Sequence, residues 1–143
     1  RGPYGRGYPM SLLEGNGVLV FGGGSGAAPV RGVIEYVHKN REKFGSVNLF
    51  YGFRGEKDIL FGEDWENWQN NDMYIDLALS EDHNHPTAVS GFVTHLMDDA
   101  LALQDNSNKV AFVCGPPIMI DCVQAMLESL GVPEEMIAFD KFG

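Results

Sequence analysis

A short apolar run that leads directly into a cluster of glycines constrains the fold of this chain most. Gly17-Val-Leu-Val-Phe21 carries no polar side chain, which is typical of a strand buried on both faces of a parallel sheet. Glycines follow over residues 22–26, and apolar residues then recur at helical spacing up to about Lys39, namely Val30, Val33, Ile34 and Val37. This order predicts a strand, a glycine turn and a helix of an α/β fold.

The same alternation continues to the end of the chain. Four further strands are expected at Val47–Tyr51, Met73–Leu79, Val110–Cys114 and Met136–Phe139. Helices are expected at Leu60–Trp68, Phe92–Ala100 and Ile118–Leu130, the last closed by Gly131, and a polar loop is expected at Ser80–Thr87. Parallel strands joined by right-handed helical crossovers predict one doubly wound, Rossmann-like α/β domain, with a five-stranded parallel sheet flanked by helices.

Size, charge and cysteine content narrow the class of protein. The 143 residues fit one domain, and a net charge of -10 argues against nucleic acid as a partner. We find no apolar run long enough for membrane insertion and no signal peptide. The two cysteines lack CxxC spacing and favour a reducing compartment, so we expect a cytoplasmic protein. Residues 1–10, rich in Gly and Pro, are expected to form an interdomain linker, and residues 11–143 the folded domain.

The glycine loop after the first strand is the first candidate ligand site. In a doubly wound sheet, ligands bind beyond the carboxyl ends of the strands, where the strand order reverses. Glycines let the backbone approach a pyrophosphate, and the helix that follows offers free N–H groups. Gly24-Ser-Gly-Ala-Ala-Pro29 has the GxGxx spacing of dinucleotide-binding turns but ends in proline. The alternative is a tight turn that binds no ligand.

The turn after the second strand carries charges that favour different nucleotides. Arg54 and Lys57 are suited to a 2′-phosphate and favour NADPH, whereas Glu56 is suited to ribose hydroxyls and favours NADH. A solvated, charged turn is the alternative to both. His83 and His85, with Asp82, have no evident further ligand, so no metal site is expected. Cys122 lies within a predicted helix and is expected in the core.

Three motifs in order resemble one family. These are Gly2-Pro-Tyr-Gly5, Gly24-Ser-Gly-Ala-Ala-Pro29 and Val113-Cys-Gly-Pro-Pro-Ile-Met119. Together they resemble the C-terminal NAD(P)-binding domain of the ferredoxin–NADP reductase superfamily over nearly the whole chain. Within it, the chain is most similar to the FAD/NAD-binding subunits of anaerobic sulfite reductases and the gamma subunits of nickel–iron hydrogenases. Its last residues, Phe139–Gly143, are more similar to the reductase components of bacterial monooxygenases, so the branch and the electron acceptor stay open.

The resemblance implies a function and a set of site residues. Members pass hydride between NAD or NADP and FAD, which a separate flavin-binding β-barrel domain holds, and the flavin then reduces an iron–sulfur or haem partner protein. Cys114 is implied beside the nicotinamide as the catalytic residue, and the alternative is an inert buried thiol at the end of an apolar strand. The implied cofactor-binding residues are Gly23, Gly24, Ser25, Gly26, Pro29, Tyr51, Gly52, Arg54, Gly115, Pro116, Pro117 and Met119. A dinucleotide-binding regulatory or docking module without chemistry of its own is the alternative function.

Overall fold

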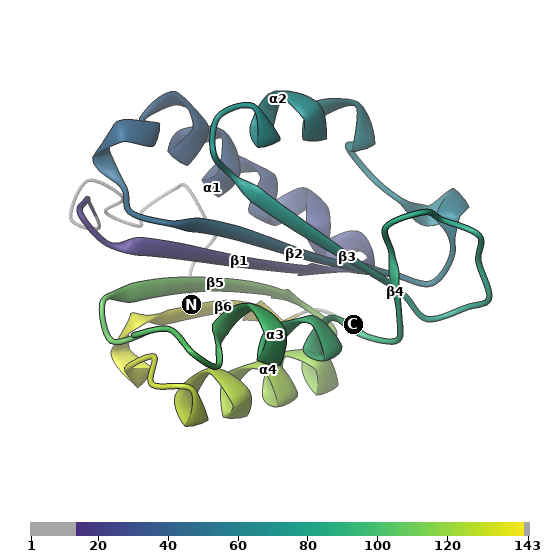
Figure 1. Cartoon of the computed structure of the whole chain (residues 1–143). Coiled ribbons are helices and arrows are strands. Elements are labelled where there is room, and N and C mark those ends of the chain that lie inside the picture. The colour runs from purple at the N-terminus through teal and green to yellow at the C-terminus, as the bar shows by residue number, and fades with distance from the viewer. Residues whose placement is uncertain (1–13, 142–143) are drawn as a thin grey trace.

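The domain is built on one parallel sheet, in a computed structural model that describes residues 14–141 (Figure 1). Its strand order is β4-β3-β2-β1-β5-β6. The strands are β1 (Gly17–Gly23), β2 (Val47–Phe53), β3 (Tyr74–Leu79), β4 (Val89–Ser90), β5 (Lys109–Gly115) and β6 (Ile137–Lys141). The chain adds strands on one side of β1 and then returns to add β5 and β6 on the other side. The strand order therefore reverses between β1 and β5.

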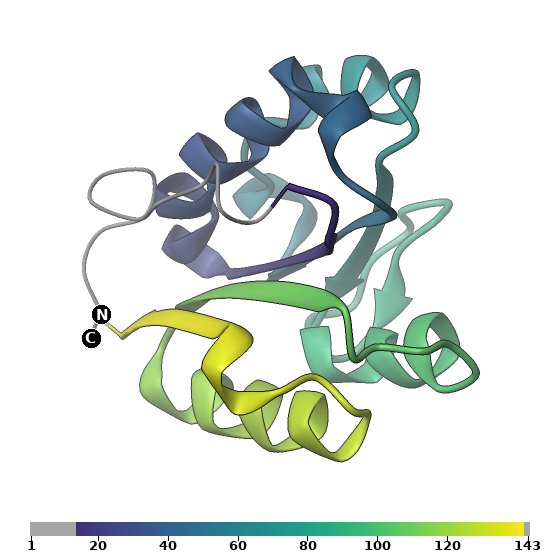
Figure 2. The same ribbon diagram turned by 90° about the vertical axis from the view of Figure 1, so that its left-hand side faces the viewer.

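Helices cover both faces of the sheet. Figures 1 and 2 show α1 (Ala27–Lys39) and α2 (Trp65–Gln69) on one face, and α3 (Met97–Leu101) and α4 (Pro117–Ser129) on the other. Each face has its own apolar cluster, one including Val33 and Trp68 and the other including Met97 and Val123. Because both faces are covered, the central strands are expected to be apolar throughout.

The central strands and the two long helices confirm the sequence-based prediction. Every residue of β1 and β5 is buried, in agreement with sequences that are apolar except for Lys109 at the start of β5. Helix α4 ends where predicted, since Gly131 has a φ of 100°, in the left-handed region that glycine adopts without strain. The N–H of Val132 donates to the carbonyl of Leu127 at 3.0 Å, and that of Gly131 donates to Glu128 at 3.2 Å. These two bonds form a Schellman motif.

The predicted number of strands was wrong by one. Over the described residues the sheet has six strands, because Val89 and Ser90 pair with Ala78 and Leu79 at its edge. The predicted helix at Leu60–Trp68 is also shorter than expected. A 3₁₀ turn at Gly62–Asp64 precedes α2, and Phe61 has a φ of 62°, which a right-handed helix does not contain. The two tryptophans nevertheless pack against the core beneath α2, as their spacing predicted.

The third predicted helix also begins later than expected. Phe92 has extended backbone, and its N–H donates to Nδ1 of His95 at 2.7 Å, so that His95 caps the segment. A 3₁₀ turn at Val93–Leu96 then leads into α3. Phe92 is therefore left 64% exposed outside the helix.

Two further predictions concern the ends of the chain and the membrane. The proposed linker at residues 1–10 lies outside the described residues, and so does the start of the predicted domain before residue 14. Within residues 14–141, every helix is too short or too polar to cross a bilayer.

Candidate functional site

The carboxyl ends of four strands meet at an open cleft. It has a volume of about 550 Å³ and lies beyond β1, β2, β3 and β5, between residues 91–94 and the start of α4. Six predicted cofactor-binding residues line it: Gly23, Gly24, Gly52, Arg54, Pro116 and Met119. Turns that are far apart in the sequence therefore converge at one edge of the sheet, as the doubly wound prediction required.

The glycine turn after β1 combines an exposed backbone with one very close packing contact. Gly24 has a φ of 56°, and no heavy atom of another described segment lies within 4 Å of where its Cβ would be, so its backbone faces open space. Gly26 is the opposite case, because a Cβ there would overlap the carbonyl group of Cys114. The start of α1 thus packs directly on the end of β5. Ser25 lies between the two glycines in the same 3₁₀ turn, Gly24–Gly26.

The side chain of Met119 fills space that two glycines leave open. A Cβ on Gly23 would overlap the Met119 sulfur, and a Cβ on Gly115 would lie only 2.7 Å from it. Gly23 and Gly115 stand at the ends of β1 and β5, on either side of the point where the strand order reverses. The thioether therefore lies against backbone at the floor of the cleft, where a flexible, polarizable side chain can adapt to a ligand.

The three prolines of the predicted site lie at helix starts. Pro29 is exposed in the first turn of α1, which tolerates proline because its N–H groups have no partner within the helix. Pro116 lines the cleft just before α4, and Pro117 is the first residue of that helix. Both are exposed. Of the three prolines, Pro116 alone lines the cleft.

Cys114 lies at the end of β5 but does not line the cleft. It is 1% exposed, belongs to the apolar cluster on the α1 face and pairs with Gly22 of β1. The cleft opens on the other face, beside α4. The structure thus brings the turn after β5 to the site and leaves the Cys114 thiol in the core.

Tyr51 likewise faces away from the cleft. Its ring stacks on Trp65 with 5.6 Å between centroids, and the residue is 1% exposed. The hydroxyl is buried and has no hydrogen-bond partner among the described residues, and burial raises the pKa of Tyr51 above its ordinary value of 10.0. Tyr51 therefore packs α2 onto the sheet, whereas its neighbour Gly52 faces the cleft.

We expect Tyr51→Phe to leave stability unchanged or to raise it by about 1 kcal/mol, because a buried hydroxyl without a partner carries a desolvation cost. Equilibrium denaturation in urea measures this change. Dinucleotide affinity should not change, because the hydroxyl lies on the face of β2 opposite the cleft. A loss of about 1 kcal/mol or more would mean that the hydroxyl makes a stabilising bond.

Arg54 is the one charged residue that lines the cleft in the described part of the chain. It is exposed, and its guanidinium makes no hydrogen bond or ion pair with another described residue. By contrast, Glu56 and Lys57 are exposed outside the lining of the cleft. A cation without a partner at the wall of a largely apolar cleft is suited to bind an anionic ligand.

The remaining residues that line the cleft were not predicted from the sequence. They are Phe53, Ser80, Gly91, Phe92, Val93, Thr94, Ile118 and Cys122. The expectation that Cys122 lies in the core was wrong, because its side chain is exposed and lines the cleft. The spacing contained the signal, since Ile120, Val123 and Leu127 form the buried stripe of α4 and leave Ile118 and Cys122 outside it.

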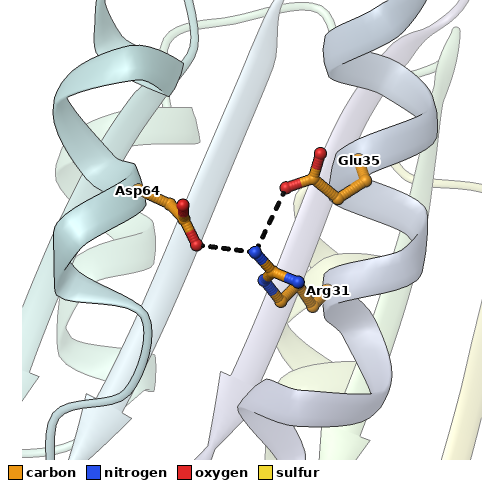
Figure 3. Close-up of polar contacts among 3 residues, drawn as sticks. All are labelled: Arg31, Glu35 and Asp64. Atoms are coloured by element: carbon orange, nitrogen blue, oxygen red, sulfur yellow. Dashed lines mark hydrogen bonds and ion pairs between the residues drawn. The ribbon is translucent and has the colours of Figure 1, made fainter.

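A separate polar cluster lies away from the cleft. Figure 3 shows Arg31 of α1 between Asp64 and Glu35. Arg31 Nη2 lies 2.8 Å from Asp64 Oδ2 and 3.7 Å from Glu35 Oε2. The hydrogen bond from Arg31 to Asp64 raises the pKa of the guanidinium. This cluster ties α1 to the start of α2, on the face of the sheet opposite the cleft.

Among the residues described, no group of three or more His, Cys, Asp or Glu side chains is arranged to hold a metal ion.

Known proteins resemble this chain in sequence and in fold. It is 32% identical over 137 residues to the sulfhydrogenase 2 subunit gamma of Pyrococcus furiosus, covering 83% of this chain and 45% of that protein. It is 31% identical over 149 residues to a component of the Na⁺-translocating NADH-quinone reductase of Haemophilus influenzae, covering 99% and 36%. The chain therefore spans less than half of the length of either relative.

Solved structures share the fold at low sequence identity. The cytochrome P450 reductase GcoB of Amycolatopsis superposes with a TM-score of 0.81 at 22% identity, covering 94% of this chain and 40% of that one. A ferredoxin NADP⁺ reductase from Neisseria gonorrhoeae with bound FAD and NADP superposes with a TM-score of 0.77 at 16% identity, covering 94% and 59%.

A family model assigns the chain directly. The model of the oxidoreductase NAD-binding domain matches residues 20–125, which include most of β1, the glycine turn, β2, β5 and most of α4. This match agrees with the order of the strands and with the cleft at their carboxyl ends. The chain belongs to the family of oxidoreductase NAD-binding domains.

Proposed function

We propose that this domain binds NAD or NADP in the cleft and holds the nicotinamide against a flavin carried by a separate domain. The observation that carries the proposal is the convergence of the β1, β2 and β5 turns on one cleft beside Arg54, which forms no ion pair with another described residue. When bound, FAD would accept the hydride and pass electrons singly to an iron–sulfur or haem partner. We expect such a protein to work in the cytoplasm, within a larger redox complex.

The residues of the cleft fit a dinucleotide. The open backbone at Gly24 and the start of α1, a helix of 13 residues, offer N–H groups and a positive dipole end to a pyrophosphate. Arg54 offers a cation to a phosphate. The apolar wall at Val93 and Ile118 suits the flat faces of a base or nicotinamide ring. In hydride transfer, this positioning is the main contribution that a protein makes.

Thermal unfolding with NAD and NADP, added separately, tests whether the domain binds a dinucleotide. A ligand that binds only the folded state stabilises it by about 2.7 kcal/mol at a concentration of 100 Kd. We expect a shift with at least one dinucleotide and none with nicotinamide alone at the same concentration. The proposal fails if neither NAD nor NADP shifts the transition at millimolar concentration.

We propose that Arg54 binds the 2′-phosphate that distinguishes NADPH from NADH. Arg54→Ala is then expected to weaken NADPH binding about tenfold or more, since a charge-assisted hydrogen bond contributes about 1.5–3 kcal/mol. NADH binding should change less. Isothermal titration calorimetry with each dinucleotide measures both effects, with Lys57→Ala as the control for loss of a nearby exposed cation. Equal losses for NADH and NADPH would contradict this role.

We propose that Cys114 contributes to hydride transfer indirectly, because its thiol packs in the core at the end of β5 and supports the turn that continues into Pro116 at the cleft. In a protein completed with its flavin domain, Cys114→Ala is expected to slow flavin reduction while dinucleotide affinity stays nearly constant. Stopped-flow absorbance at the flavin band measures the rate. An unchanged rate would remove Cys114 from the mechanism and leave it as a core residue.

A further inference from the structure

Two neighbouring turns at the cleft are joined by hydrogen bonds that continue past the ends of their strands. The N–H of Ser80 donates to the carbonyl of Phe53 at 3.1 Å, and the N–H of Glu81 donates to the carbonyl of Arg54 at 2.8 Å. These bonds extend the pairing of β2 with β3 into the turns. Arg54 and Ser80 both line the cleft, so the same bonds fix two parts of its wall relative to each other.

A third bond comes from a side chain. The carboxylate of Glu56 accepts a hydrogen bond from the N–H of Asn84 at 2.9 Å, across 28 residues of sequence. Asn84 lies in the polar loop between β3 and β4, a few residues beyond Ser80. A charged acceptor makes a stronger bond than a neutral one, and here the bond joins two exposed segments.

The local structure around Glu56 fixes the backbone from which its side chain extends. Glu56 begins a 3₁₀ turn, Glu56–Asp58, in which the N–H of Gly55 donates to the Asp58 carboxylate at 3.1 Å and the N–H of Asp58 donates to the Gly55 carbonyl at 3.0 Å. Gly55 also lets the loop come close, because a Cβ there would lie 3.1 Å from a carboxylate oxygen of Glu81. The turn is thus a defined anchor from which Glu56 reaches the loop.

We infer that Glu56 is a positioning residue that holds the Ser80–Asn84 loop against the Arg54 turn, and is not a ligand of the nucleotide ribose. The inference rests on the proposed dinucleotide function of the cleft. The Glu56 carboxylate already binds a backbone N–H outside the lining of the cleft, whereas a ribose ligand would face into it. Losing the bond leaves only the two backbone bonds at Ser80 and Glu81 to join the turns, so that Ser80 and Arg54 are held less firmly for a phosphate or a ribose.

Three variants separate positioning from direct contact. Glu56→Ala removes the acceptor, Glu56→Gln keeps an acceptor oxygen without the charge, and Asp82→Ala removes an exposed acid from the same loop as a control. Exchange of the Asn84 amide with water, followed by NMR, reports the bond itself. Calorimetric titration with NADH and with NADPH reports the site.

Glu56→Ala is expected to speed exchange at the Asn84 amide about tenfold, because one such bond is lost. It should weaken NADH and NADPH by the same factor, between about threefold and tenfold. Glu56→Gln should restore both readouts to within about threefold of the parent, because a neutral acceptor makes a weaker bond, and Asp82→Ala should leave both unchanged.

Two results would overturn the inference. One is selective loss of NADH binding in Glu56→Gln with normal Asn84 exchange, which is the behaviour of a ribose ligand. The other is unchanged exchange in Glu56→Ala, which would show that the bond does not hold the loop. If the parent bound neither dinucleotide, the proposed function would fail, while the exchange measurement would still show whether Glu56 holds the loop.

Discussion

Gly26→Ala is expected to destabilise the domain by about 3 kcal/mol, because the new methyl group meets backbone that has no means of moving aside. The backbone of Gly26 has a φ of -66°, which alanine adopts without strain, so the expected loss is purely steric. The obstacle is the carbonyl group of Cys114 in the central strand β5. Relief would require α1 to move away from the sheet and would open the core between α1, β1 and β5.

Gly32→Ala is the matched control for this substitution. Gly32 lies within α1, the helix that Gly26 precedes, is exposed, and has no heavy atom of another described segment within 4 Å of its Cβ position. Alanine there should raise the free energy of unfolding by up to about 1 kcal/mol, because glycine is unfavourable in a helix interior. Urea denaturation of both variants measures the difference. Equal stabilities for the two would mean that α1 does not pack on β5 as closely as described.

Cys122→Trp is expected to reduce dinucleotide affinity about a hundredfold or more, because an indole at this position occupies the cleft. The cleft supplies contacts to the pyrophosphate and to the rings of the dinucleotide, and losing either set would cost about 1–3 kcal/mol of binding free energy. Cys122 is exposed, so the larger side chain needs no rearrangement of the core and stability should stay near that of the parent. Isothermal titration calorimetry with NADH and NADPH measures the loss.

Ala125→Trp provides the control for an added indole on the same helix. Ala125 is also exposed on α4 but does not line the cleft. Its affinity for either dinucleotide should equal that of the parent. If Cys122→Trp also bound both dinucleotides with parental affinity, the ligand would bind elsewhere on the domain.

The parts of the fold that sequence predicted well are those in which burial dictates residue type. Strands β1 and β5 are buried on both faces and read as largely unbroken apolar runs, and α1 has a regular buried stripe. The edge strand β4 was missed because two exposed residues leave no apolar pattern. The start of α2 was misplaced because the left-handed backbone of Phe61 is unusual for a phenylalanine.

Sequence likewise predicted some residues of the candidate site and missed others. The glycine turn after β1 indicated Gly23 and Gly24, because parallel topology brings such turns to one edge, whereas Gly52 was implied only by the family resemblance. Alternation along β2 places the side chain of Tyr51 on the opposite face from Gly52. Sequence did not indicate which of the two faces meets the cleft, because that depends on how helices and turns pack around the sheet. The wall at Gly91–Thr94 depends on how the segment after β4 folds back over β2, a long-range contact with no local signature.

Mapping the dinucleotide onto the domain by NMR tests the central claim most directly. NADH and NADPH, added separately to the labelled 143-residue chain, should shift backbone amides at Gly23, Gly52, Thr94 and Met119, which line the cleft at the carboxyl ends of the strands. Amides at the opposite strand ends, such as Val18, Tyr74 and Val110, should stay in place. Shifts confined to those opposite ends, or no shift at a saturating concentration of either dinucleotide, would contradict the account.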